Sequence, residues 1–221
     1  MKKSRSQLLV VAVLALLGSG LASGCSHESP AAKREEKAKT PRATPAEGDW
    51  IKIEVPDGQQ VAQVKVEGDN TRIEFGSTSL AGQQKETGKR KYQNAAGALT
   101  AEVKADDDQA FKVRTPDAKL LWKIKLGPEK IKIANNEEMN NPFAIEIKEA
   151  NRMKVYRNEQ EIGDVRFRGA NGKVKVETAA GSTAFTANAS RISAGYGVLL
   201  MSDIPEAERY IIVAELIARG R

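Results

Sequence analysis

The residues D-I-P-E-A-E-R-Y-I-I-V-A-E-L-I-A-R-G-R, at positions 203–221, decide the fold of this chain. Asp203 is placed to cap a helix, and Glu206 follows it at the spacing of a capping box. Gly220 is placed to end the helix, because glycine accepts the left-handed conformation that follows many helix C-termini. The pattern therefore predicts a helix over residues 204–219.

This helix is apolar around most of its circumference, and Glu208, Glu215 and Arg219 fall on one narrow stripe. A helix with so little polar surface is buried either in a protein core or in a membrane. A bilayer needs about 20 apolar residues in a helix, so this segment is too short to cross one. We therefore expect the helix to lie inside or against a sheet, as the main plug of the core.

The chain from Trp50 to the start of this helix shows period-2 alternation of apolar and charged residues. Strands of this kind have one face in a core and one in water, and turn residues at intervals of about 8–12 residues separate them. The sequence predicts a mainly β fold, an antiparallel meander of about 12 strands that forms a barrel or a sandwich around the helix. The alternating runs are Ile51–Val55, Val64–Val66, Ile73–Phe75, Phe111–Val113, Leu120–Leu126, Ile131–Ile133, Phe143–Ile147, Met153–Val155, Val165–Phe167 and Val174–Val176.

One stretch, Gly76–Gly97, is rich in Gly, Ser, Gln and Lys and has poor periodicity. It is interpreted either as a mobile loop or as a hairpin that involves Lys89–Gln93. An outer-membrane barrel is excluded for the whole region, because the outward face of such a barrel must be apolar over about 25 Å.

Lysines alternate along several of the predicted strands, as in Lys123/Lys125, Lys130/Lys132 and Lys173/Lys175. They are interpreted as solvated outer faces that also deter pairing at sheet edges. A continuous basic stripe is the alternative.

The N-terminus has the order of a secretory signal, with Lys and Arg in Met1–Gln7, an apolar run over Leu8–Leu17 and small residues over Gly18–Gly24. The end of this segment, Leu21–Cys25, resembles the lipobox of bacterial lipoproteins. The resemblance implies cleavage between Gly24 and Cys25 and attachment of fatty acyl groups such as palmitate to Cys25. Ordinary cleavage after Ala22 is the alternative.

If Cys25 is lipidated, residues 1–24 are removed and residues 25–48 form an acylated, disordered tether, because the latter have mixed charge and no large apolar side chain. Residues 49–221 are then a single β domain. Under the usual sorting rule for such lipoproteins, a residue other than Asp directly after the lipidated cysteine directs the protein to the outer membrane of a Gram-negative bacterium. That residue here is Ser26. The domain would face the periplasm or the cell surface.

The chain has one Cys and one His, Cys25 and His27, and both precede the β domain. Ser-His-Asp triads, Cys-His pairs and zinc sites built from Cys or His are therefore excluded in the domain. We expect no catalytic residue, no cofactor and no metal ion, although chemistry by paired carboxylates stays open. The formal net charge of +6 is weak support for a nucleic-acid partner, because the signal segment carries half of it.

Two oxygen-rich loops are candidate Ca²⁺ sites, namely Asp106–Asp108 and Asn135–Glu138 with Asn140–Asn141. Neither has the spacing of an EF-hand, so both are interpreted as solvated loops. Three other features have simpler explanations: the pair Ser202-Asp203 as a helix cap, and Trp50 and Trp122 as core residues.

Many antiparallel strands followed by a hydrophobic C-terminal helix resemble the tubby-like superfamily, which includes the LURP-one-related proteins. The resemblance covers about residues 50–219 and depends on the strand spacing, on Glu161–Phe167 and on Ile204–Arg219. It implies a barrel of about twelve strands around the helix and binding or rearrangement of membrane phospholipids. No residue matches a lipid-binding motif of that superfamily.

Three functions remain open from the sequence. The first is a membrane-anchored envelope lipoprotein whose non-catalytic β domain binds a protein or a lipid-like ligand, with no nucleic-acid partner. The second is a structural lipoprotein that organises the envelope. The third is a hydrolase that uses paired carboxylates.

Overall fold

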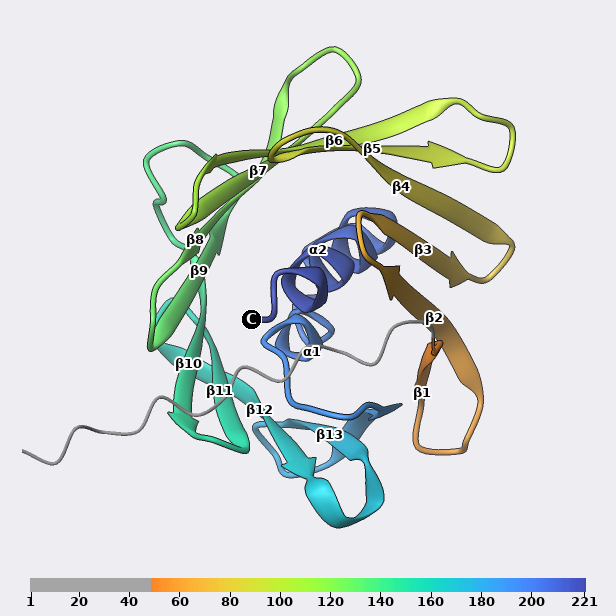
Figure 1. Cartoon of the computed structure of the whole chain (residues 1–221). Coiled ribbons are helices and arrows are strands. Elements are labelled where there is room, and N and C mark those ends of the chain that lie inside the picture. Colours follow the sequence, from red (N-terminus) through yellow and green to blue (C-terminus); the bar gives the residue numbers. More distant parts are fainter. Residues whose placement is uncertain (1–48) are drawn as a thin grey trace, which may run out of the picture. The chain divides into compact units, whose positions relative to one another are not determined.

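The computed structural model describes residues 49–221, which form a closed barrel of fourteen antiparallel strands around two helices (Figure 1). The predicted signal segment, the lipidation site Cys25 and the tether lie outside the described residues. The strands are β1 (Ile51–Glu54), β2 (Gln60–Glu67), β3 (Asn70–Phe75), β4 (Thr78–Glu86), β5 (Lys89–Asn94), β6 (Leu99–Asp107), β7 (Ala110–Arg114), β8 (Leu120–Leu126), β9 (Lys130–Ala134), β10 (Phe143–Glu149), β11 (Arg152–Arg157), β12 (Gln160–Arg168), β13 (Lys173–Thr178) and β14 (Thr183–Asn188). The helices are α1 (Gly195–Val198) and α2 (Glu206–Ala218), and a 3-10 turn spans Gly169–Asn171.

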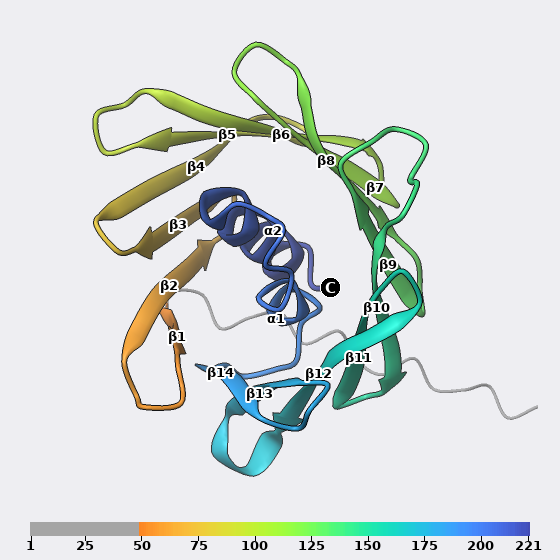
Figure 2. The same cartoon turned by 180° about the vertical axis from the view of Figure 1, so that it is seen from behind.

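Each strand pairs with the next along the chain, and β1 pairs with β14 to close the barrel (Figure 2). The predicted fold class, an antiparallel meander with a buried C-terminal helix, is confirmed, with fourteen strands rather than about twelve. The closing seam is short, since its register joins Ile53 to Ala187 and Glu54 to Thr186. The side chain of Asn188 extends the seam, because its Oδ1 accepts a hydrogen bond of 2.5 Å from the backbone N–H of Lys52.

The segment Gly76–Gly97 contains two of the four strands that periodicity did not reveal, and the other two are β6 and β14. It forms the hairpin of β4 and β5, so the hairpin interpretation is the correct one. These two strands direct Gly82, Arg90 and Tyr92 inward, where other strands place aliphatic side chains. The alternation of aliphatic and charged residues that predicts the other strands is therefore missing from β4 and β5.

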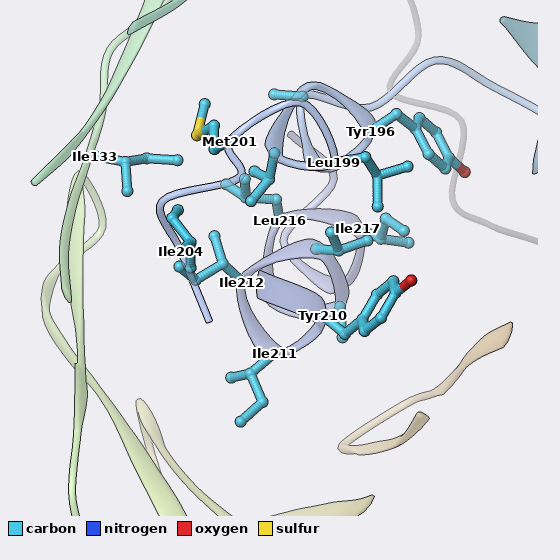
Figure 3. Packing of buried hydrophobic residues seen from close by; sticks show 14 of the residues in the cluster. Ile133, Tyr196, Leu199, Met201, Ile204, Tyr210, Ile211, Ile212, Leu216 and Ile217 are labelled. Carbon is cyan, nitrogen blue, oxygen red and sulfur yellow. The ribbon is translucent and has the colours of Figure 1, made fainter. Parts of the chain in front are cut away.

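Helix α2 fills the barrel. Its residues from Tyr210 to Ile217 are all buried, and Ile212, Val213 and Leu216 are fully inaccessible to solvent. Figure 3 shows the packing around it, with Tyr196 and Leu199 from the α1 region, Ile204 ahead of α2 and Ile133 from the wall. The predicted plug is thus confirmed as the centre of one continuous core.

The two ends of α2 differ in how well the sequence predicted them. Gly220 adopts a φ of 67°, and the N–H of Arg221 reaches the carbonyl of Leu216 at 2.9 Å, so the helix ends in a Schellman motif as expected. The predicted cap at Asp203 is wrong. Pro205 occupies the N-cap position, and no side chain caps the helix. The carboxylate of Asp203 instead pairs with Arg157 at 3.1 Å, since a favourable ion pair is available on the neighbouring wall.

The meander places alternate turns at opposite ends of the barrel. One end, called the Asp49 end, carries the start of the described chain, the C-terminus of α2 and the turns at 68–69, 87–88 and 108–109. The opposite end carries the N-terminus of α2. No helix in residues 49–221 has the length and apolar character needed to cross a membrane.

Candidate functional site

A cluster of polar side chains, the polar clamp, lies inside the barrel near the Asp49 end. It consists of Thr71 on β3, Arg90 and Tyr92 on β5, and Glu215 and Arg219 on or directly after α2. Glu215 is completely buried, and Tyr92 is equally inaccessible. Buried charges of this kind are uncommon unless they are paired, so their partners decide what the clamp can do.

The Glu215 carboxylate is held on both of its oxygens. Its Oε1 accepts hydrogen bonds from Arg90 Nη1 at 2.6 Å and from the Tyr92 hydroxyl at 2.8 Å. Its Oε2 lies 3.2 Å from Arg219 Nε, one helical turn further on. The Tyr92 hydroxyl also accepts a hydrogen bond from Thr71 Oγ1 at 3.1 Å. The carboxylate is thus a charged acceptor that is fully used by its neighbours.

The surroundings shift the acid–base behaviour of the clamp in a consistent direction. Burial, together with the nearby Glu215 charge, raises the pKa of the Tyr92 hydroxyl well above its ordinary value. Burial opposes the charge on Arg90, but the Glu215 carboxylate outweighs this effect and raises the pKa of Arg90. Arg90 therefore stays charged and Tyr92 stays neutral, which makes the clamp a fixed ion pair rather than a proton-transfer site.

Two wall residues, Gly82 on β4 and Phe111 on β7, accommodate the clamp. A Cβ at Gly82 would overlap Thr71 Oγ1 and lie 2.7 Å from the Tyr92 ring, so glycine is needed there. On the other side, the guanidinium of Arg219 stacks 4.6 Å from the centre of the Phe111 ring. Such a contact keeps the arginine head in place where it leaves the core.

A cavity of about 500 Å³ adjoins the clamp at the Asp49 end. Arg90, Glu215 and Arg219 contribute to its wall, and the loop Asp106–Asp108 forms part of its rim. The acids of this loop have partners of their own, since Asp106 pairs with Lys112 at 3.1 Å. Asp107 Oδ1 accepts the N–H of Gln109 at 2.7 Å. Asp106 and Asp107 are therefore engaged, whereas the carboxylates of Asp69 and Asp108 at the same cavity make no hydrogen bond or ion pair within residues 49–221. The carboxylate hydrolase stays a prediction.

A second cavity, of about 310 Å³, lies beside the seam of the barrel at the same end and is called the seam cleft. Several of its polar groups are already bonded within the protein. Arg191 Nη2 donates to the carbonyl of Ile217 at 3.2 Å, and Ser193 Oγ donates to the carbonyl of Arg221. Most of the side chains that remain are apolar or aromatic, so the cleft suits an apolar group. They are Trp50, Ile51, Val66, Ala189, Tyr196 and Ile217, and the polar Asp49 and Ser190 lie beside them.

The loop residues proposed from the sequence lie apart from the clamp, except for the Asp106–Asp108 rim. In the loop after β9, Asn136 and Asn140 bond each other, and Glu137 pairs with Lys112 at 3.0 Å and with Lys123 at 2.9 Å. Within residues 49–221, no three acidic, His or Cys side chains are grouped as metal ligands.

The two tryptophans differ in their surroundings. Trp122 is a core residue, as predicted, and its indole N–H donates to Glu208 Oε2 at 2.5 Å. Trp50 is only half-buried, lines the seam cleft and is not part of the core, so the prediction of a core residue is wrong for Trp50.

Sequence reasoning missed Arg90, Tyr92 and Thr71 as partners of Glu215. A signal for them was present, because a glutamate deep in an apolar helix requires a cation in the wall around it. The aperiodic stretch around Arg90 was the place to look for that cation.

Comparisons with known proteins add little to this geometry. No family model matches the chain, and comparison with curated proteins gives no match. Among solved structures, a plant protein from Arabidopsis thaliana, of the LURP-one-related type, is 7% identical and has a TM-score of 0.35. The similarity covers 62% of this chain and 89% of the plant chain. A likeness this weak carries no argument, and the tubby-like resemblance stays a prediction.

The clamp predicts strong coupling between Arg90 and Glu215. Glu215→Gln leaves a buried guanidinium without its counter-ion, and Arg90→Met leaves the carboxylate with one cation fewer. Each change is expected to cost about 3–5 kcal/mol of the free energy of unfolding in urea. The double variant Arg90→Met/Glu215→Gln should be less destabilised than the sum of the single changes, while Glu206→Gln on the exposed side of α2 should change little. Additive effects of the two single changes would contradict the clamp.

The raised pKa of Tyr92 predicts a loss of stability in alkali. Above about pH 10 the unfolded chain ionises this tyrosine while the folded chain keeps its proton, so the unfolded state binds fewer protons and stability falls as pH rises. Tyr92→Phe should be less stable at pH 8, because a hydrogen bond to Glu215 is lost, yet its decline above pH 10 should be shallower. Tyr156→Phe is the control. Parallel declines for the wild type and Tyr92→Phe would be inconsistent with this interpretation.

Proposed function

We propose that this protein is a lipoprotein anchored through Cys25 in the outer membrane of a Gram-negative envelope. Its β domain is a non-catalytic binding module for a lipid-like or protein ligand. The observation that carries the binding proposal is the filling of the barrel by α2, whose apolar side chains occupy the lumen. A ligand is therefore bound at the surface or at a barrel end, not inside the lumen.

The polar clamp supports the non-catalytic part of the proposal. Glu215 is inaccessible and is held by Arg90, Tyr92 and Arg219, so it is unsuited to act as a free base. A general base must reach the proton that it removes. The role that suits this carboxylate is to fix the orientation of α2 in the barrel.

The seam cleft supports the binding part. At about 310 Å³ it is at the small end of the range for ligand sites, about 300–1,000 Å³. It combines two aromatic side chains, Trp50 and Tyr196, with an aliphatic floor that includes Ile217. We propose that it receives one acyl segment or one apolar side chain of the ligand.

Both parts can be tested in one set of cells that express the full chain in a Gram-negative host. With radiolabelled palmitate, the wild type should be labelled and sediment with the outer membrane, whereas Cys25→Ser should be unlabelled and released. A photo-crosslinking benzoylphenylalanine at Trp50 should give a discrete adduct, and the same group at Gln160, exposed at the opposite end, should not.

The two arms fail independently. Equal sedimentation of an unlabelled wild type and of Cys25→Ser would refute the anchor. Identical adduct patterns at Trp50 and Gln160, or none at either position, would refute the seam cleft as the binding site. The size of the adduct distinguishes a lipid-like ligand from a protein.

A further inference from the structure

The outer wall of the barrel carries lysines in direct cross-strand register. Lys89 on β5 lies opposite Lys104 on β6, Lys104 lies opposite Lys112 on β7, and Lys112 lies opposite Lys123 on β8. These four residues are called the lysine row. Between β8 and β9, Lys125 on β8 lies opposite Lys132 on β9. Sequence alternation showed that lysines face outward, but only the register shows that they are stacked on one another.

The neighbouring row shows an arrangement of alternating charges in the same wall. Lys91, Glu102 and Arg114 lie opposite one another on β5, β6 and β7, so their charges alternate. Like charges directly opposite one another destabilise a sheet by up to roughly 1 kcal/mol per pair. The lysine row therefore carries a cost that the adjacent row avoids.

Acids compensate the lysine row only in part. Lys89 lies 3.4 Å from Glu102, Lys112 lies 3.1 Å from Asp106, and Lys112 and Lys123 share Glu137 at 3.0 and 2.9 Å. By contrast, Lys104, Lys125 and Lys132 are exposed and make no ion pair within residues 49–221. The wall from β5 to β9 thus keeps an unneutralised positive stripe.

Protection of a sheet edge does not explain this stripe. Edge lysines are useful where a strand has unpaired N–H and C=O groups. Here β5 to β9 lie within a closed barrel, and each has a partner on both sides (Figure 1). The sequence-based interpretation of these lysines as edge protection is therefore wrong for these strands, although their outward, solvated position is confirmed.

The stripe runs around the barrel rather than along a strand. With strands about 4.8 Å apart, the four inter-strand steps from Lys89 to Lys132 span roughly 19 Å of a convex wall. A flat surface touches a convex wall over only part of this length, whereas a flexible linear chain can follow it. In an extended peptide, side chains on one face repeat at roughly 6.6–6.8 Å, which is wider than the strand spacing. A linear polysaccharide with an acid on every sugar ring carries one negative charge per ring along a chain that can follow the wall.

We propose that the stripe formed by the lysine row, Lys125 and Lys132 binds a linear acidic polysaccharide. The lysines contact successive carboxylates, and release of the counter-ions bound to both partners contributes to the affinity. The choice of a polysaccharide over a nucleic acid rests on the proposed function, because an envelope protein meets such polymers. The site is separate from the seam cleft and from Cys25.

The test uses the full-length chain, purified in a neutral detergent, and fluorescent oligogalacturonate as the probe. The variant removes the three unpaired lysines as Lys104→Gln/Lys125→Gln/Lys132→Gln, which disturbs no described ion pair. The control removes the same charge at exposed sites elsewhere, as Lys52→Gln/Lys119→Gln/Lys173→Gln. Poly-glutamate, single-stranded DNA and vesicles that contain phosphatidylglycerol are the competing probes.

The wild type should bind oligogalacturonate with an affinity that falls steeply with salt, as expected for counter-ion release. The stripe variant should bind at least roughly tenfold more weakly, with a smaller salt slope, while the control stays within about twofold of the wild type. No binding, equal losses in variant and control, or preference for the peptide, the DNA or the vesicles would each overturn the proposal. Because the assay does not depend on lipidation, its failure leaves the Cys25 anchor untouched.

Discussion

The ion pair between Arg90 and Glu215 joins the wall of this protein to its core at a distance of 2.6 Å, with the Glu215 carboxylate inaccessible to solvent and Arg90 largely buried. The apolar surface of α2 supplies the driving force for burying the helix, but such surface is non-directional and is compatible with many rotations about the helix axis. A buried charge has far fewer acceptable positions, because an unpaired one is costly. We infer that Glu215 sets the rotation of α2 and that Arg90, Tyr92 and Gly82 are placed in the wall to accept it.

The same constraint explains which parts of the fold were predictable from sequence. Strands such as β8 and β9, with Ile124 and Ile131 facing inward, follow from period-2 alternation, and α2 follows from its apolar circumference. The β4–β5 hairpin was only one of two interpretations of its segment, because the wall there faces a carboxylate and carries glycine, arginine and tyrosine at inward positions. Local patterns report burial in an apolar core, whereas the contacts of Glu215 with Arg90 and Tyr92 join residues more than 120 positions apart in sequence.

The seam cleft and the lysine stripe were even harder to predict from the sequence. The seam cleft forms where β1 and β14 meet, so its lining combines residues from the two extremes of the described chain, such as Trp50 and Ser193. The stripe on β5 to β9 depends on register, which the sequence leaves undetermined between strands. Because α2 fills the barrel, a ligand can bind only to surfaces such as these. The proposed roles of the cleft and the stripe are consistent with a domain that binds its partners and does not transform them.

Native-state hydrogen exchange of the α2 amides tests the central claim most directly, since the claim is that wall and plug form one cooperative unit held at the clamp. The account predicts that the amides from Ile211 to Leu216 exchange only through global unfolding, with the same free energy as inward-facing residues of the wall such as Val103 and Ile124. Exchange of the α2 amides through a partial opening of much lower free energy, while the strands stay protected, would contradict it. The barrel would then be stable without its helix, and the Arg90–Glu215 pair would not be the contact on which the structure depends.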